Sequence, residues 1–342
     1  MRRRVLVLMG GRSSEHDVSL SSARSVMNAL DPERHEVVPV LIDRDGAWTR
    51  EGRGVALCPG PDGRGVLVPL EGGAPEPVDV VFPVLHGPFG EDGTVQGLCD
   101  MAGLPCVGAG VAASAIAMDK ALFKHLAHQA GIPVADAVVV TAGEWADDPD
   151  AIRRAAAGLG DTVFVKPARL GSSVGISRVT SAEDLDDAIR LALEHDERIL
   201  VERGVRGKEV EVGVLGDHEL VVSPPGQISY DAEWYDYETK YQAGLASLQI
   251  PADLPPPVAE RARELAERAY RAVGCEGMGR IDFFVTDDGE VLVSELNTIP
   301  GFTPTSAYPS LMGAAGVGYS ELVTRLVDLA VARAERTARL RR

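Results

Sequence analysis

The sequence has little cysteine, and its cysteines lack the spacing of a metal site. Cysteine occurs only four times, and no pair has the CxxC pattern. Short CxxC spacings are typical of zinc sites, whereas small secreted domains carry dense disulfide frameworks. The sequence therefore favours neither feature. We expect a protein of the reducing cytoplasm.

Long apolar runs are also missing. No segment approaches the roughly 18 apolar residues that a membrane-spanning helix needs. Residues 1–11 contain three arginines and then only five apolar residues before two glycines. That run is too short for the apolar core of a signal peptide. We interpret residues 5–9 as a buried strand and expect neither a membrane span nor a secretory leader.

Basic residues are outnumbered by acidic ones. The chain has 34 Lys and Arg against 51 Asp and Glu, which gives a formal net charge of −17. This charge repels nucleic acid and anionic membranes, so we expect neither as a partner. An anionic substrate such as a nucleotide would need local lysines, glycine-loop amides or divalent cations.

The chain is long enough for more than one domain. Its 342 residues exceed the roughly 100 to 200 of an ordinary domain, and its 45% apolar content can build large cores. Residues 5–9, 36–42 and 78–85 are strand-like, and a helix with Ser19 as its N-cap follows the first of them. This order predicts an open α/β sheet. We place domain boundaries at residues 1–117, 118–207 and 208–342.

The remaining elements suggest a second α/β unit and a long functional loop. We expect helices over residues 119–131, 148–157, 182–195 and 257–273, and strands over residues 134–141, 163–166, 198–203 and 209–215. Residues 52–77 lack helical periodicity and are expected to hold short strands. Residues 223–249 form a connection too long for a compact domain unless it is functional, so we interpret them as an active-site loop.

The segment GRIDFFVTDDGEVLVSELN, residues 279–297, predicts a β-hairpin. Asp288 and Gly289 are typical of a two-residue turn between apolar strands. A turn there places Asp282 opposite Glu295, and Arg280 opposite Asn297. Strand alternation puts these four side chains on one face, and the other face takes the apolar set of Ile281, Phe283, Val285, Leu292 and Leu296.

Facing carboxylates are unfavourable unless a positive charge neutralises them. Mg²⁺ prefers carboxylate and carbonyl oxygens together with phosphates and water, so Asp282, Glu295 and Asn297 are candidate ligands. Arg280 beside such phosphates would stabilise negative charge in a transition state. The alternative is an exposed hairpin in which Arg280 and the acids form an ion-pair ladder. The turn of residues 298–301 that follows favours the metal site, because Gly301 lets backbone amides approach a ligand.

Two glycine-containing segments are candidate nucleotide contacts. KPARLGSSVG, residues 166–175, is typical of a hairpin flap whose amides, serines and Lys166 bind phosphate, although it lacks the P-loop spacing. Residues 108–113 resemble the NAD-binding glycine fingerprint, but no acidic residue follows at the required distance. We interpret them as a tight turn into a helix that brings Lys120 towards the nucleotide.

Other polar residues are ambiguous when taken alone. Glu15 and His86 lie in loops after buried strands, where a solvated acid and a hydrogen-bonded histidine are the simpler interpretations. YDYETKY, residues 235–241, has three tyrosines and a lysine, which is unusual for a mere linker.

Seven segments together resemble the D-alanine:D-alanine ligase family of the ATP-grasp superfamily. They occur in the family's order over nearly the whole chain: GGRSSEHDVSL, HGPFGEDG, MDK, KPARLGSSVG, YDYETKY, GRIDFF and ELNTIPGF. The resemblance implies an α/β ATP-grasp fold with an N-terminal Rossmann-like open sheet. It also implies a cytoplasmic homodimer that makes a peptidoglycan precursor from two D-alanine molecules and ATP. The metal would be two Mg²⁺ ions, which Mn²⁺ can replace.

The resemblance assigns roles to matching residues. Lys120, Lys166, Ser172, Ser173 and Lys240 would contact ATP phosphates, Glu202, Arg203 and Val205 the adenine, and Glu209 the ribose. Asp282, Glu295 and Asn297 are similar to the metal ligands. Glu15, Ser172 and Tyr241 resemble a triad that orients the first D-alanine, while His86 and Ser306 resemble substrate-holding residues. Arg280 and the Gly301 amide are similar to an oxyanion site.

Three alternatives compete with this hypothesis. A related ligase could use D-lactate or D-serine as its second substrate, although Tyr241 argues against D-lactate because lactate-using relatives generally lack a tyrosine there. A nucleotide-binding regulatory protein would have lost metal or oxyanion residues, and none is missing. An NAD-dependent oxidoreductase would show cofactor absorbance instead of ATP turnover.

Overall fold

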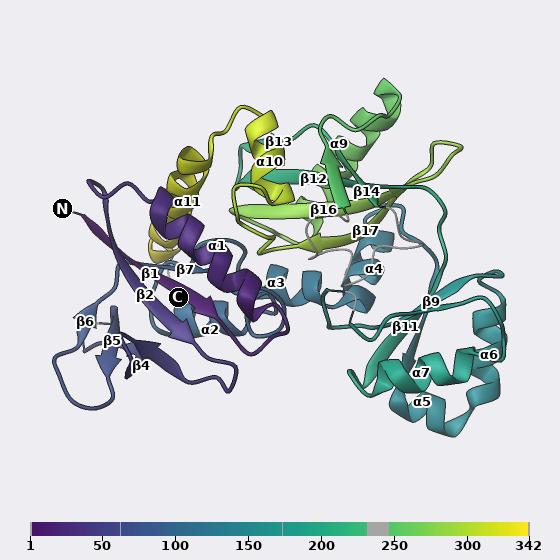
Figure 1. Cartoon of the computed structure of the whole chain (residues 1–342), viewed down its shortest axis with the longest axis horizontal. Helices are drawn as coiled ribbons and strands as arrows, with labels where there is room; N and C mark the ends of the chain where they lie inside the picture. The colour runs from purple at the N-terminus through teal and green to yellow at the C-terminus, as the bar shows by residue number, and fades with distance from the viewer. Residues whose placement is uncertain (1, 62, 173, 231–245, 341–342) are drawn as a thin grey trace.

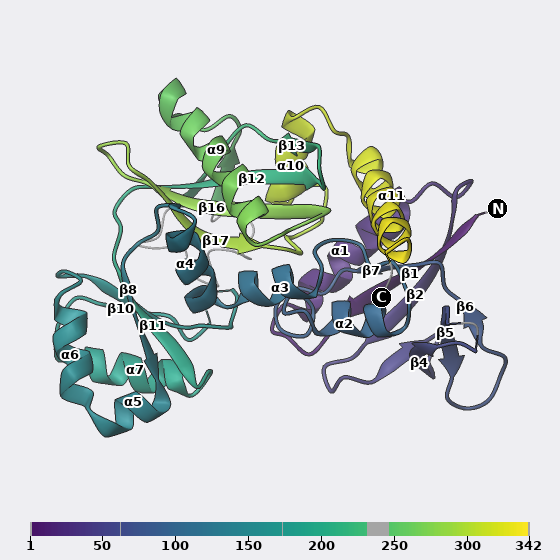
Figure 2. The same cartoon turned by 180° about the vertical axis from the view of Figure 1, so that it is seen from behind.

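Three β-sheets with helices packed on them make up the fold (Figures 1 and 2). The computed structural model describes residues 2–61, 63–172, 174–230 and 246–340. Within these ranges, no helix is long and apolar enough to cross a bilayer. The loop residues Lys240 and Tyr241 and the flap residue Ser173 lie outside the described residues.

The N-terminal sheet has seven strands in the order β6-β5-β4-β3-β2-β1-β7. β1 is parallel to both β2 and β7, which confirms the predicted open α/β arrangement. Four short antiparallel strands extend the sheet, and three of them lie within residues 52–77, where short strands were expected. The strands are β1 (Arg3–Gly10), β2 (His35–Ile42), β3 (Trp48–Arg50), β4 (Arg53–Pro59), β5 (Gly65–Pro69), β6 (Glu76–Pro77) and β7 (Val80–Pro83).

Helix α1 (His16–Ala29) begins four residues before the predicted start. Its N-cap is Glu15, so the prediction that Ser19 caps this helix is wrong. Ser19 is buried inside the helix, where its hydroxyl accepts a hydrogen bond from the Gly10 amide at 2.8 Å and donates one to the Val84 carbonyl. The hydroxyl therefore joins the helix to the ends of two strands instead of capping it. α2 (Thr94–Met101) follows later in this part of the chain.

The second sheet is antiparallel, with the strand order β10-β9-β11-β8. Its strands are β8 (Ala137–Thr141), β9 (Val163–Pro167), β10 (Ser177–Val179) and β11 (Arg198–Arg203), and its helices are α5 (Ala142–Asp147), α6 (Pro149–Ala157) and α7 (Leu185–Leu193). Asp148 caps α6 by accepting the Ala151 amide at 2.9 Å, which explains why this helix starts where the sequence predicts. The glycine loop, which is the predicted flap of residues 166–175, connects β9 to β10, as expected of a hairpin.

The third sheet contains the predicted hairpin. Its main path runs β15-β14-β12-β16-β17, and β13 pairs with β12. The strands are β12 (Lys208–Gly216), β13 (Leu220–Val222), β14 (Gly226–Tyr230), β15 (Ala246–Gln249), β16 (Met278–Val285) and β17 (Val291–Asn297). Helices α3 (Val111–Met118), α4 (Lys120–Gln129) and α9 (Pro256–Ala272) contribute buried residues to the core beneath this sheet.

The C-terminal helices return the chain to the first sheet. α10 (Ala307–Ala314) packs on β12, and α11 (Tyr319–Ala338) contacts α1 and β7. Leu322, Leu326 and Val327 of α11 share one buried cluster with Val5 and Val7 of β1. Figure 1 shows this helix, drawn in yellow, lying beside the purple α1. The two ends of the chain thus hold the first and third sheets together, and a cavity lies where the sheets meet.

Candidate active site

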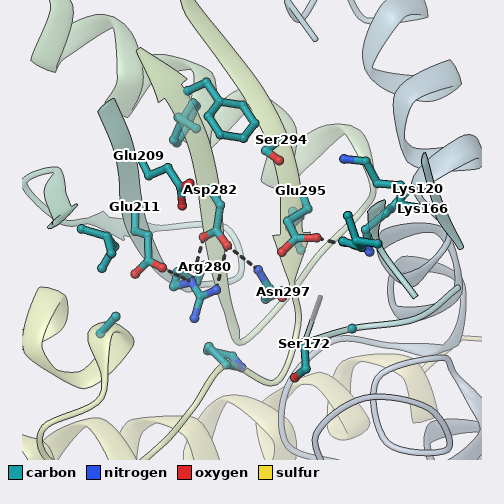
Figure 3. Close-up of a pocket in the computed structure, with 18 of the residues that line it drawn as sticks. Lys120, Lys166, Ser172, Glu209, Glu211, Arg280, Asp282, Ser294, Glu295 and Asn297 are labelled. Atoms are coloured by element: carbon teal, nitrogen blue, oxygen red, sulfur yellow. Dashed lines mark hydrogen bonds and ion pairs between the residues drawn. The ribbon is translucent and has the colours of Figure 1, made fainter. Parts of the chain in front are cut away.

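A cavity of about 1590 Å³ lies among the three sheets (Figure 3). The predicted site residues come from distant parts of the sequence, yet every one in the described part of the chain lines this cavity. They are Glu15, His86, Lys120, Lys166, Ser172, Glu202, Arg203, Val205, Glu209, Arg280, Asp282, Glu295, Asn297, Gly301 and Ser306. The fold therefore brings these side chains together. It does not by itself assign their roles.

The hairpin of β16 and β17 places its polar residues as the sequence predicts. Asp282 pairs directly with Glu295, and Arg280 pairs with Asn297. Figure 3 shows all four side chains on the cavity side of the sheet. Ile281, Phe283 and Leu296 point the other way and belong to the buried cluster under the sheet. The predicted opposition of two carboxylates is confirmed.

The predicted two-residue turn of this hairpin is wrong. Thr286 and Glu290 close the turn through a backbone hydrogen bond of 3.0 Å, so three residues lie between them. The register then shifts between Asp282 and Phe283, where Ser294 is the extra residue of β17. This bulge compensates for the longer turn. The turn shifts the pairing of the two strands by one residue, and the bulge shifts it back by one residue. The register at the site is therefore preserved.

The same bulge overturns one predicted core position. Before Ser294 the alternation of β17 is inverted, so Val291 and Val293 join the cluster under the sheet. Leu292 is buried but lies outside that cluster, opposite Phe284, which lines the cavity. Leu292 was expected beside Ile281, and an alternation count without the bulge produces that error.

A row of three carboxylates crosses the floor of the cavity. Glu211 of β12 pairs with Asp282, which pairs in turn with Glu295. Arg280 holds Asp282 through its Nε and Nη2 atoms, each 2.7 Å from a carboxylate oxygen, and its Nε lies 3.3 Å from Glu211. The Asn297 amide donates to Asp282 at 3.0 Å. Burial opposes charge on Arg280, but Asp282 and Glu211 outweigh it and hold the pKa of Arg280 well above its ordinary value.

The donor set fits magnesium bound together with phosphate. Asp282 and Glu295 offer carboxylate oxygens from adjacent strands, and Asn297 adds an amide oxygen. Within the described residues, no three His, Cys, Asp or Glu side chains form a ready metal cage. Mg²⁺ commonly uses one or two carboxylates and takes its other ligands from substrate phosphates and water. These residues therefore fit a metal that arrives with a phosphate ligand.

Two lysines face the acidic floor from the opposite wall. Lys120 begins α4, and its Nζ lies 3.3 Å from Glu295 and donates to the Leu170 carbonyl at 2.9 Å. Lys166 of β9 contacts Glu202 at 2.5 Å. The expected turn into a helix is present at residues 108–110, but α3 ends at Met118 and Lys120 opens a second helix capped by Asp119. Ser172 of the glycine loop adopts a φ of 53° and lines the same cavity.

The turn after β17 is held by side chains of the N-terminal domain. Glu91 accepts the Ile299 amide at 2.9 Å and the Gly87 amide at 2.7 Å. His86 Nδ1 lies 2.8 Å from the Ile299 carbonyl, and its Nε2 lies 3.2 Å from the Ser22 hydroxyl. Ser22 also accepts the Phe302 amide at 3.2 Å. Gly301 is therefore fixed from both sides.

Two groups beside this turn, the buried His86 and the partly buried Glu91, have shifted pKa values. Burial lowers the pKa of His86, so the ring is neutral, and Nδ1 donates to the Ile299 carbonyl while Nε2 accepts from Ser22. Burial, followed by the nearby Glu15, raises the pKa of Glu91 to about 8. Both ring nitrogens of His86 are thus engaged by the protein, and Ser306 hydrogen-bonds Thr303 through the same turn at 2.8 Å.

Sequence reasoning missed several residues of the site. Glu91, Glu211, Ser22 and Lys124 all contact predicted site residues or their turn. Glu91 lies in the family-like segment HGPFGEDG, and an acidic residue in such a loop carries no signal of its contact with the Ile299 amide. The alternation of β12 could have found Glu211, because it lies two residues after Glu209. Ser22 and Lys124 carry no sequence signal beyond their place on a helix.

Two family models match the chain. The model of the D-ala D-ala ligase N-terminus matches residues 4–109, and that of the D-ala D-ala ligase C-terminus matches residues 126–328. Together they span most of the 342 residues.

Similar proteins match nearly the whole chain. A D-alanine–D-alanine ligase of Deinococcus radiodurans is 51% identical, covering 97% of this chain and 99% of the relative. D-alanine–D-alanine ligase A of Mesorhizobium japonicum is 46% identical, covering 97% of this chain and 98% of the relative.

Solved structures agree. The VanG D-Ala:D-Ser ligase from Enterococcus faecalis has a TM-score of 0.88 and 34% identity, with 96% of this chain and all of that chain covered. The D-alanine–D-alanine ligase from Coxiella burnetii has a TM-score of 0.88 and 32% identity, with 98% and 96% covered. The chain belongs to the D-alanine–D-alanine ligase family, enzymes of the ATP-grasp fold that join two D-alanines with ATP for peptidoglycan precursor synthesis.

Proposed function

We propose that Asp282, Glu295 and Asn297 hold two Mg²⁺ ions, or Mn²⁺ in their place, with the terminal phosphates of ATP. The observation that carries this proposal is the direct opposition of Asp282 and Glu295 on the cavity floor. Two facing carboxylates need a positive partner, and Arg280 and Lys120 already lie against them. Bound magnesium supplies charge neutralisation at the phosphates that these residues face.

The remaining polar lining is assigned to the nucleotide. Lys120 and Lys166 bind phosphate oxygens, and Ser172 and Ser173 donate from the flap. Glu202 and Arg203 at the end of β11, and Val205 just after it, lie against the adenine, and Glu209 binds the ribose. Cavity-lining positions on β9, β11 and β12 support these assignments for the described residues. Lys240, outside the described residues, is assigned to the γ-phosphate by family resemblance alone.

The two amino acids occupy the end of the cavity near the N-terminal sheet. Glu15 and Ser172, together with Tyr241 of the loop, orient the first D-alanine. His86 and Ser306 hold the substrates, His86 through the turn that it fixes. Support comes from Glu15, His86, Ser306 and Gly301, all of which line this cavity.

The reaction follows from this placement. The carboxylate of the first D-alanine attacks the γ-phosphorus of ATP, and ADP leaves with the electron pair of the broken bond, giving an acyl phosphate. The free amine of the second D-alanine then attacks the acyl carbon. Arg280 and the Gly301 amide stabilise the tetrahedral oxyanion, and its collapse expels phosphate and leaves the dipeptide. The flap and the tyrosine loop exclude water from the acyl phosphate.

The experiment should determine which second substrate the enzyme uses. We favour D-alanine over D-lactate and D-serine, and the similarity to a D-Ala:D-Ser ligase makes D-serine the competitor to test. Phosphate release from ATP would be measured with D-alanine alone and with added D-serine or D-lactate, and the products separated by chromatography. Alanyl-alanine as the main product supports the proposal. Phosphate release without any dipeptide contradicts it.

The cellular setting is part of the same proposal. We place the enzyme in the cytoplasm as a homodimer without nucleic-acid or membrane partners, with domains at residues 1–117, 118–207 and 208–342. The net charge of −17 supports the exclusion of anionic partners. The resemblance to the family supports the dimer.

A further inference from the structure

Lys124 lies beneath the nucleotide region without lining the cavity. It follows Lys120 by one turn of α4, so both lysines lie on the same side of the helix. Only 9% of its side chain is exposed. Its Nζ donates to the Ala135 carbonyl at 3.0 Å and lies 2.6 Å from Glu202. A lysine is rarely buried unless it is paired, so this position needs an explanation.

Glu202 is shared by two lysines. Lys166 contacts its Oε1 at 2.5 Å, and Lys124 contacts its Oε2 at 2.6 Å. The carboxylate is 5% exposed, and within the described residues these two are its ion-pair partners. Burial raises the pKa of Glu202, but Lys166 and Lys124 outweigh it and hold the pKa below its ordinary value. Glu202 is thus a buried anion between two cations.

The two lysines differ in what they can reach. Lys166 lines the cavity and faces the space assigned to the phosphates, whereas Lys124 does not line it. If Lys166 moves to a phosphate oxygen, it must give up part of its contact with Glu202. A buried carboxylate that loses its only cation is strongly destabilised. With Lys124 in place, Glu202 keeps one cation when Lys166 turns to the nucleotide.

We propose that Lys124 is a positioning residue for ATP binding: it neutralises Glu202 so that Lys166 is free to bind a nucleotide phosphate. Without Lys124, Glu202 would hold Lys166 as its sole partner, and the site would lose a phosphate-binding charge. This inference rests on the proposed role of Lys166 in the nucleotide site. It adds a residue from α4 that does not touch the ligand.

The test compares Lys124→Met with Lys124→Arg. Calorimetry would measure the Kd of ADP, and steady-state assays the KM for ATP and for D-alanine. For Lys124→Met we expect both nucleotide constants to rise at least tenfold, with the KM for D-alanine changed less than twofold. Lys124→Arg keeps the charge and should bind ADP within threefold of the wild type. Arg261→Met, which removes an exposed charge on α9, is the control for net charge and should bind ADP normally.

A double variant separates positioning from a structural role. Glu202→Gln removes the buried charge that traps Lys166, so Lys124→Met combined with Glu202→Gln should bind ADP as Glu202→Gln alone does. If Lys124 only anchors α4, Lys124→Met lowers the Tm but leaves the Kd of ADP unchanged. Alternatively, Lys124→Met weakens ADP binding and the double variant binds ADP as weakly as Lys124→Met, so that removing the Glu202 charge restores nothing. Either result overturns the inference. Should Lys124→Met fail to fold, Lys124→Gln takes its place and keeps a donor for the Ala135 carbonyl.

Failure of the proposed function would look different. A wild-type protein that binds no ADP refutes the nucleotide site itself, because the comparison then has no binding to lose. Wild-type binding that Lys124→Met retains in full refutes only the role of Lys124.

Discussion

Arg280 holds both carboxylate oxygens of Asp282, with Nε–Oδ1 and Nη2–Oδ2 distances of 2.7 Å each. The two residues lie two positions apart on β16 and so share its cavity face. This fork contact fixes the guanidinium plane over the row of carboxylates. The Nε of Arg280 also lies 3.3 Å from Glu211, so one guanidinium contacts two of the three carboxylates.

Arg280→Lys should therefore lower kcat by a factor of about 100 or more, since lysine is a point charge without the planar fork that positions two donors. The KM for ATP should change only a few fold, because ground-state binding uses other residues. Arg34→Lys is the matched control: it alters a similar two-contact pair with Asp328 at the surface. Steady-state kinetics on both variants measure the effect. A kcat within fivefold of the wild type for Arg280→Lys would contradict the oxyanion role.

Glu295→Gln should raise the Mg²⁺ concentration needed for half-maximal rate at least tenfold. The change removes one of two facing carboxylates and leaves Lys120 without its 3.3 Å partner, so the local charge becomes less favourable for a cation. The rate would be titrated with MgCl₂ at saturating ATP and D-alanine. Glu290→Gln, an exposed change on the same hairpin, should follow the wild-type curve. Full activity of Glu295→Gln at low magnesium would rule out its role as a ligand.

The hairpin shows how far the sequence could predict this site. Period-two alternation placed Asp282 against Glu295 correctly, because the longer turn and the bulge at Ser294 cancel at that position. Between the turn and the bulge the pairing differs from the prediction by one residue. Alternation therefore assigns Leu292 to the cluster under the sheet, where the structure has Val291 and Val293. A bulge depends on tertiary packing and leaves no reliable local signal. The prediction was thus correct where the two errors offset each other.

The contacts of other residues could not be predicted from local sequence patterns for a different reason. The local sequence predicts that Ser19 caps a helix. In the structure its hydroxyl instead bonds the Gly10 amide and the Val84 carbonyl, at the ends of two strands that are distant in the sequence. Ser22 and Glu91 contact a turn more than 200 residues away. Helix propensity and periodicity report on neighbours within a few positions, so they cannot reveal such pairings. The resemblance of the seven segments to a known family predicts the site residues, because it depends on many positions along the chain and not on neighbours alone.

Ser22→Ala should loosen the turn that carries Gly301. The Ser22 hydroxyl accepts the Phe302 amide and donates to His86, and all three groups are buried, so its loss leaves two unsatisfied partners that cost about 1–3 kcal/mol. We expect a lower Tm and a kcat reduced about tenfold, with an unchanged Kd for ADP. Ser320→Ala, an exposed serine of α11, should change neither quantity. An unaltered kcat would show that the turn keeps its geometry without Ser22.

Glu91 should make the folded protein less stable as pH rises. Burial, then the nearby Glu15, raises the pKa of Glu91 to about 8 from an ordinary 4.5. The folded state therefore keeps a proton that the unfolded state releases above pH 4.5. Stability from this proton is fully present below that pH and is lost up to about pH 8, at a slope of up to about 1.4 kcal/mol per pH unit.

Glu91→Gln removes the titrating group, so the difference in unfolding free energy between wild type and variant should itself depend on pH. Urea unfolding at several pH values between 5 and 8.5 would measure it. Relative to the variant, the wild type should be at its most stable near pH 5 and should lose that advantage towards pH 8. Glu71→Gln, at an exposed position, should give a constant difference. A constant difference for Glu91→Gln as well would mean that its two backbone donors, Gly87 and Ile299, keep the carboxylate ionised in spite of burial.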